Sequence, residues 1–224
     1  MANIFRNLDI SILTNMLISI IPALLCITIH ELSHGYVAYR LGDNTAKDMG
    51  RLTLNPIKHI DVIGIIMMVV VGFGWAKPVP VNMRNFSKPK QYMAITAIAG
   101  PISNILLAVV IFFIYGLIFS KLSGPYATST GTLVLQIVSR MGSLSVALAV
   151  FNIIPIPPLD GSKVLFALLP DSYYMKLMRY ERYGMLLLIV FVWSDLFSAT
   201  FGKATTVVYD FLSGISIFAY SLVR

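Results

Sequence analysis

The stretch CITIHELSHGYVAYR, residues 26–40, places two histidines and a glutamate directly after a long apolar run. Residues 10–29 carry no charge, and about twenty such residues are what an α-helix needs to cross a bilayer. The helix then continues from His30 to Arg40, which adds about 15 Å at 1.5 Å per residue. We therefore expect His30, Glu31 and His34 to lie inside the membrane rather than at its surface.

The composition of the whole chain of 224 residues also indicates a membrane protein. Hydrophobic residues make up 57% and charged residues only 12%, against about 25% charged in globular proteins. Further uncharged runs cover 91–120, 122–139 and 141–159. The sequence predicts an integral, multi-pass membrane protein of the all-α class. The single cysteine, Cys26, excludes an internal disulfide.

The net charge of +7 is an indicator of orientation here. Most basic residues lie in two polar regions, 40–90 and 163–182, and an excess of lysine and arginine marks the cytoplasmic side of membrane proteins. We expect both regions to face the cytoplasm. The lipid bilayer is the expected surrounding, and nucleic acid is not an expected partner.

Hydropathy and turn residues predict a single domain, 1–224. Its core, about 10–170, has three spans, followed by two apolar C-terminal segments within about 183–222. The predicted helices cover about 10–41, 92–119, 132–155, 159–169, 183–200 and 204–222. Gly42 is the expected C-terminal cap of the first.

A small β element and a re-entrant segment are predicted between the first two spans. Residues 50–56 and 76–82 alternate like edge strands and contain prolines. Between them, residues 62–75 are apolar but too few to span a membrane, and they contain three glycines. We expect this part of the chain near the cytoplasmic face.

His30 and His34 are four residues apart, so they project from one face of a helix and can share a metal ion. Glu31 can then serve as general base toward a metal-bound water. Ionisable side chains inside a spanning helix need a compensating partner, and a metal ion is one. The alternative is a helix end that has already left the membrane, where the three side chains are simply solvated.

Asp160, in PPLDG (157–161), is the candidate third ligand, since a catalytic zinc has three protein ligands and one open position. It follows prolines that break the third span, on the same side and at similar depth as the histidines. Taken alone, it also fits an ordinary turn or helix-capping aspartate. The need for a third ligand favours the metal.

Together, HELSH, GRLTLNPIKHID, GWAKPVPVN, GPISN and NIIPIPPLDG, spread over about 20–170, resemble the site-2 protease family of zinc-dependent intramembrane metalloproteases. The chain is similar to the small prokaryotic members without a PDZ or CBS domain. The resemblance implies one zinc per chain, held by His30, His34 and Asp160, with Glu31 as the catalytic glutamate. It also implies a prokaryotic cell membrane and single-span transmembrane substrates.

Asn152 and Asn104 match the polar residues of the motifs NxxPxxPLDG and GPxxN. Asn152 is a candidate catalytic and substrate-binding residue that donates to a developing oxyanion, but it could equally satisfy the broken helix. Asn104 is either substrate-binding or a link between helices.

Other functions and residues stay open at this point. A metal transporter or metal sensor would use the same ligands without needing Glu31 as a base, and an inactive relative would bind membrane segments without cutting them. His59 is expected to be interfacial and solvated. The sequence leaves open the oligomeric state and the roles of Cys26, Asp195 and Asp210.

Overall fold

The computed structural model describes residues 10–64, 75–124, 127–180 and 183–223, and every regular element in these ranges is a helix. This confirms the predicted all-α class. The four long helices are α1 (Ile10–Arg40), α4 (Pro89–Leu122), α5 (Ser129–Ile153) and α9 (Asp195–Ser221). The shorter ones are α2 (Thr45–Asp48), α6 (Asp160–Ala167), α7 (Asp171–Tyr180), α8 (Gly184–Val192) and the 3-10 turns η1 (Pro56–His59) and η2 (Met83–Asn85).

Within the described ranges, three helices are long and apolar enough to cross a membrane. They are residues 18–40 of α1, all of α4 and all of α5, with mean hydropathies of 1.3, 2.6 and 1.7. The helices α8 and α9 are bent by 82° relative to each other and make a fourth crossing if the pair is one span. These helices are consistent with a multi-pass membrane protein.

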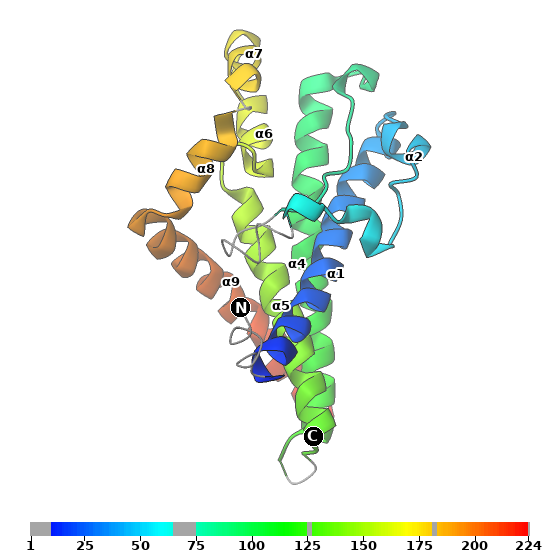
Figure 1. Ribbon diagram of the computed structural model, residues 1–224, viewed down its shortest axis with the longest axis vertical. Coiled ribbons are helices and arrows are strands. Elements are labelled where there is room, and N and C mark those ends of the chain that lie inside the picture. The colour runs from blue at the N-terminus through cyan, green and yellow to red at the C-terminus, as the bar shows by residue number, and fades with distance from the viewer. Residues whose placement is uncertain (1–9, 65–74, 125–126, 181–182, 224) are drawn as a thin grey trace, which may run out of the picture.

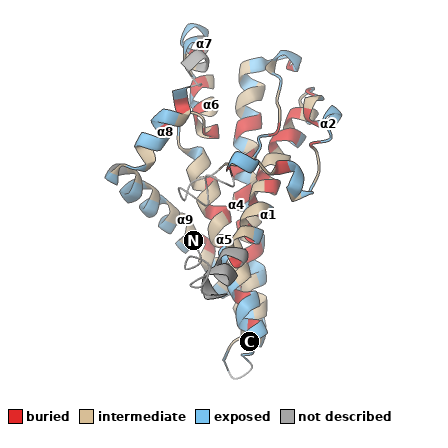
Figure 2. Ribbon diagram, in the orientation of Figure 1, coloured by how far each residue is buried: buried red, intermediate tan, exposed pale blue. Residues whose placement is uncertain are grey.

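Helix α4 is the centre of the bundle and packs against α1, α5, α6 and α9 (Figure 1). The core between α4, α5 and α9 is built from Ala108, Phe112, Val146 and Leu212. Gly116 of α4 lies directly against the backbone of Ser216, so α4 and α9 approach closely. Most buried residues lie along α1, α4 and α5, whereas α8 and the first part of α9 are largely exposed (Figure 2).

The helix ends agree with the sequence in some places and differ in others. Gly42 follows α1 with φ +106°, as expected for its cap. The predicted helix 159–169 is α6, but α7 was not predicted. The break between the last two segments lies at residues 193–194, not at 201–203. Ser194 caps α9 there by accepting a hydrogen bond from the Phe197 N–H at 3.2 Å.

The predicted β element is wrong: no strand occurs among the described residues, which include 50–56 and 76–82. Residues 75–82 have no regular secondary structure, and side chains bind several of their backbone groups. The N–H of Val79 donates to Glu31 at 2.8 Å, and Arg51 donates to the Lys77 carbonyl at 2.9 Å. Prolines have no N–H to give to a ladder, which further disfavours a strand here.

The predicted re-entrant segment, 62–75, lies mostly outside the described residues. Its two ends are described and adjacent, because a side chain on Gly64 would meet the backbone of Trp75.

Candidate metal centre

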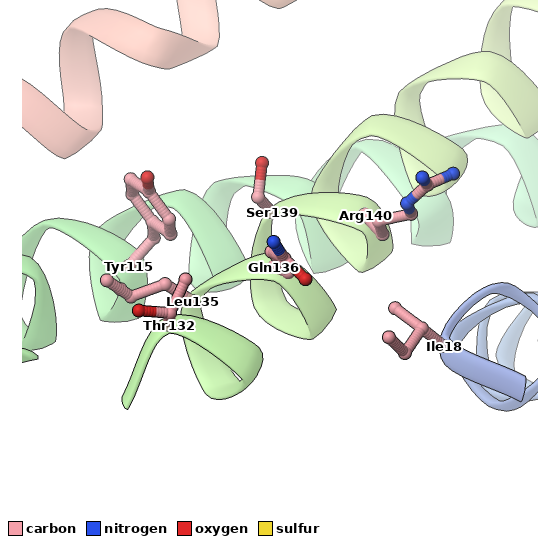
Figure 3. A pocket seen from close by; sticks show the side chains of 7 residues that line it. All are labelled: Ile18, Tyr115, Thr132, Leu135, Gln136, Ser139 and Arg140. Atoms are coloured by element: carbon pink, nitrogen blue, oxygen red, sulfur yellow. The ribbon is translucent and has the colours of Figure 1, made fainter. Parts of the chain in front are cut away.

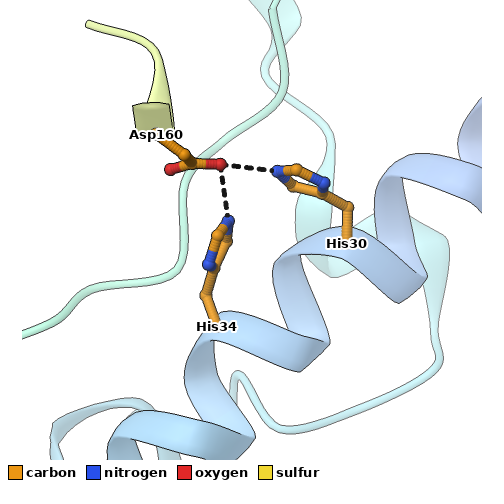
Figure 4. A group of neighbouring side chains, drawn as sticks. All are labelled: His30, His34 and Asp160. Carbon is orange, nitrogen blue, oxygen red and sulfur yellow. Dashed lines mark hydrogen bonds and ion pairs between the residues drawn. The ribbon is translucent and has the colours of Figure 1, made fainter. Parts of the chain in front are cut away.

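His30, His34 and Asp160 come together from two separate helices. The histidines are one turn apart on α1, and Asp160 is the first residue of α6. The Oδ2 atom of Asp160 lies 3.1 Å from the Nε2 atom of each histidine (Figure 4). All three side chains are buried, and within the described part of the chain they form the one such group able to hold a metal ion.

Asp160 reaches the histidines because the chain turns sharply after α5. Helix α5 ends at Ile153, and Pro155, two residues on, cannot continue it. The next turn packs directly on this end: a side chain on Gly161 would collide with the backbone carbonyl of Ile153. The sequence Asp-Gly is therefore required by packing as well as by the carboxylate.

Gly100 of α4 forms the wall of the site behind both imidazole rings. A Cβ atom on Gly100 would lie 2.5 Å from the His34 Nε2 atom and 2.6 Å from the His30 Cε1 atom. Atoms do not approach this closely, so only glycine lets α4 pack against these rings. The GPISN motif is explained in part by this contact.

The hydrogen bonds of His34 leave its Nε2 atom available for a metal ion. Its Nδ1 atom lies 2.7 Å from the backbone carbonyl of Thr96, which can only accept. Nδ1 therefore carries a proton, and in the neutral ring this leaves Nε2, the nitrogen nearest Asp160, free to bind a metal ion. Partners of this kind on the second ring nitrogen are typical of metal-binding histidines.

The surroundings of His30 also fit a metal ion. Its Nδ1 atom lies 3.3 Å from the Asn104 side-chain nitrogen, and the buried Asn104 Oδ1 atom has no hydrogen-bond partner. A metal on Nε2 puts the proton on Nδ1, which then needs an acceptor. Rotating the Asn104 side-chain amide by 180° exchanges its nitrogen and oxygen. The oxygen then accepts a hydrogen bond from Nδ1 and is no longer without a partner. Two imidazole nitrogens and a carboxylate are a donor set suited to zinc.

Asn104 is thus placed for positioning His30. Its side chain has no exposed surface, and it is not among the residues lining the cavity at the site. Its own backbone carbonyl accepts a hydrogen bond from Ser145 of α5 at 2.7 Å, which ties α4 to α5. The predicted contact between Asn104 and substrate has no support in this position.

Residues 75–82, here called the covering segment, pass over Glu31. The Val79 N–H donates to the Glu31 Oε2 atom at 2.8 Å. The buried Arg51 holds the segment from the other side, donating to the carbonyls of Lys77 at 2.9 Å and Pro78 at 3.3 Å. The orientation of Glu31 therefore depends on residues that are distant in the sequence.

Asp43 fixes the far end of the covering segment. Its carboxylate accepts from the Asn82 N–H at 2.7 Å, the Asn85 side chain at 2.7 Å and the Thr45 hydroxyl at 2.5 Å. Burial raises the pKa of Asp43, but these hydrogen bonds outweigh it, so its pKa is below the usual value. Asp43 therefore remains charged in the folded protein.

A cavity of about 440 Å³ opens in front of the three candidate ligands. Glu31, Asn152 and Lys163 line it together with residues of α4 and the covering segment. The Lys163 Nζ atom lies 3.8 Å from the Asp160 Oδ1 atom, the carboxylate oxygen that faces away from the histidines. Asn152 donates one amide hydrogen to the Leu148 carbonyl at 3.0 Å.

The remaining candidates lie outside this group. The Cys26 thiol is 3.5 Å from the Met141 carbonyl and packs between α1 and α5. The expectation of a solvated His59 is wrong: His59 is buried, and its ring is 2.9 Å from the Thr53 carbonyl. Asp195 and Asp210 are exposed on α9.

Sequence reasoning missed Gly100, Arg51, Asp43 and Lys163. Only Lys163 had a usable signal, since it is one helical turn after Asp160. The others act through contacts between distant segments, which no local pattern reveals.

A buried His–His–Asp group beside a glutamate, within a bundle of apolar helices, is typical of one class of protein, the membrane-embedded metalloproteases. Residues 18–194, which contain the whole group, match Peptidase family M50. The chain belongs to this family, the site-2 proteases.

Three relatives are each named "Putative zinc metalloprotease", and their individual names are YwhC, MJ0611 and Rip2. YwhC of Bacillus subtilis (strain 168) is 44% identical over 172 residues, which are 76% of this chain and 78% of YwhC. MJ0611 of Methanocaldococcus jannaschii is 34% identical over 165 residues, 73% of this chain and 76% of MJ0611. Rip2 of Mycolicibacterium smegmatis is 25% identical over 203 residues, 88% of this chain and 74% of Rip2. No solved structure matches the chain significantly.

Proposed function

We propose that the protein is an intramembrane zinc metalloprotease that hydrolyses peptide bonds in or near the transmembrane segments of single-span proteins. The convergence of His30, His34 and Asp160 carries this proposal, because it puts three buried ligand-type side chains beside a glutamate within a bundle of apolar helices. Membership of family M50 supports peptidase chemistry.

Each polar residue has a distinct role in this proposal. Zinc, when bound, would polarise the peptide carbonyl and lower the pKa of water. The Glu31 carboxylate takes a proton from the attacking water and returns it to the leaving amine. The Thr96 carbonyl accepts from the Nδ1 atom of His34, and the Asn104 side-chain oxygen, once the amide has turned by half a rotation, accepts from the Nδ1 atom of His30.

We propose that Asn152 binds the substrate carbonyl. It lines the same cavity as Glu31, and one of its two amide hydrogens is used by the Leu148 carbonyl. The second hydrogen is available for an oxygen that gains negative charge during the reaction. We assign Asn152 this role as a proposal.

We propose that a transmembrane substrate enters through an apolar cavity beside the site. It has a volume of about 240 Å³ and shares Asn152 and Asp160 with the first cavity. Residues of α4, α5 and α6 line it, and Ile153 and Leu168 are 55% and 80% exposed. A substrate helix could approach the ligands from the lipid between α4 and α6.

The charge distribution supports a cytoplasmic location for the metal-ligand end. Many basic residues lie in the loops around α2, η1 and η2 and at the start of α4: Arg40, Lys47, Arg51, Lys58, Lys77, Arg84, Lys88 and Lys90. Such an excess is typical of the cytoplasmic side.

The test is cleavage of a panel of tagged single-span substrates by purified protein in detergent, with bound zinc measured in the same samples. We expect the wild type to cut. Glu31→Gln should keep about one zinc per chain and not cut, because the three ligands are intact while the base is gone. Asp48→Asn, which removes an exposed carboxylate on α2, is the matched control and should cut normally.

Loss of zinc in Glu31→Gln would contradict the assigned role of Glu31. If neither protein cuts although both hold zinc, the protease proposal fails. Zinc flux into vesicles under those conditions would favour a transporter that uses the same ligands.

A further inference from the structure

A separate cavity lies between α1, α4 and α5, beside the first half of α5, whereas the metal-ligand group lies beyond the end of that helix. Its volume is about 440 Å³, within the range of sites that bind small molecules. Its lining residues are drawn in Figure 3: Ile18, Tyr115, Thr132, Leu135, Gln136, Ser139 and Arg140.

Arg140 is the only charged residue of α5, and it lies within the membrane-spanning part of this helix. Leu133 and Val134, nearer the start of α5, are each 38% exposed, as is Phe119 on the adjoining end of α4. These residues form apolar surface between Arg140 and the end of the bundle where α4 ends and α5 begins. Arg140 is itself exposed, and it lies about 10 Å farther along the axis of α5 than Leu133, at 1.5 Å per residue.

The guanidinium of Arg140 has little to compensate its charge. Among the described residues, its hydrogen-bond partner is the Ser19 hydroxyl, 3.3 Å from Nη1, and no carboxylate forms an ion pair with it. A cation at this depth requires a polar or anionic partner. The five N–H groups of a guanidinium leave several donors available.

The other polar side chains of the cavity add donors of the same kind. Gln136 lies three residues before Ser139 and four before Arg140, so it is a neighbour of both on the surface of α5. Tyr115 faces the same cavity from α4 (Figure 3). In the described structure, no hydrogen bond engages the side chains of Gln136 or Ser139 or the hydroxyl of Tyr115. No carboxylate lines the cavity.

We propose that this cavity binds the phosphate of an anionic phospholipid, with Arg140 as its main ligand. Guanidinium groups bind phosphate oxygens in pairs, and Gln136 and Ser139 supply further hydrogen bonds. Ile18 and Leu135 give an apolar wall for the lipid chains. Zwitterionic lipids bind less well because the cavity offers no carboxylate to their cationic headgroup.

The test uses native mass spectrometry of the full-length protein in detergent, titrated with phosphatidylglycerol, with phosphatidylcholine or with inorganic phosphate. We expect one phosphatidylglycerol to bind, and phosphatidylcholine to bind about tenfold more weakly. Arg140→Gln should weaken phosphatidylglycerol binding by about tenfold or more, because charge-assisted hydrogen bonds are lost. Lys203→Gln, which removes an exposed cation on α9, should leave binding unchanged.

A second variant keeps the proposal testable if Arg140→Gln does not fold. The double substitution Gln136→Leu and Ser139→Ala keeps the charge and should weaken phosphatidylglycerol binding severalfold. Unchanged binding in either the single or the double variant overturns the proposal. Equal binding of both lipids also overturns it, as does binding of inorganic phosphate without phosphatidylglycerol.

Discussion

Gly100 of α4 lies so close to His34 of α1 that a Cβ atom on it would be 2.5 Å from the imidazole Nε2 atom. The same atom would be 2.6 Å from His30. A single hydrogen at this position therefore allows the central helix to support both candidate ligands at once.

Gly100→Ala should reduce bound zinc to well below one per chain and abolish cleavage, since at least one imidazole must move. Zinc measured in the purified protein checks this. Gly214→Ala is the control: this glycine is also inside a long helix, but nothing lies within 4 Å of an added Cβ. Full zinc content in Gly100→Ala would show that the rings do not depend on this contact.

Asn104→Ala should weaken zinc binding by about 10- to 100-fold, the usual effect of removing a partner of a metal-binding histidine. Competition with a chelator measures this affinity. If Asn104 instead contacted substrate, the substitution would raise KM and leave zinc affinity unchanged.

Arg51→Met should slow cleavage by about tenfold while zinc is retained, because loss of its charged hydrogen bonds frees the covering segment that orients Glu31. The measurements are kcat and zinc content on the same sample. Arg84→Met removes an exposed cation from η2 and should have no effect. Equal rates for wild type and Arg51→Met would contradict the role given to the segment.

Asp43→Asn should destabilise the protein at neutral pH by about 1–3 kcal/mol, the cost of weakening hydrogen bonds to a buried charged group. The pKa of Asp43 is lowered by folding, so its stabilisation is present above the unfolded pKa of about 3.9 and is lost as pH falls through the folded value. Thermal unfolding should therefore show a difference from wild type that is largest near neutral pH and shrinks below about pH 4. A difference that is independent of pH would show that the charge of Asp43 is not responsible.

The sequence predicted the parts of the structure that depend on local pattern. The spacing of His30 and His34 fixes their common face on a helix. The run Pro-Pro-Leu-Asp-Gly marks the break that brings Asp160 to them. Uncharged runs gave the three spans to within a few residues.

The errors occur where distant groups decide the local structure. Residues 76–82 alternate like a strand, but their backbone is bound by Glu31, Arg51 and Asp43, which no short pattern shows. His59 follows a lysine beside an apolar run, yet it is buried, and its ring is 2.9 Å from the Thr53 carbonyl. The break before α9 is set by the Ser194 cap, and Gly202 is simply tolerated inside the helix.

The most direct measurement of the central claim is the position of cleavage, read by mass spectrometry, in a single-span substrate reconstituted with the protein in liposomes. The account predicts new termini within or at the edge of the substrate's transmembrane segment, produced by wild type and absent with Glu31→Gln. Cleavage confined to the substrate's water-exposed domains, or termini that persist in Glu31→Gln, would contradict it.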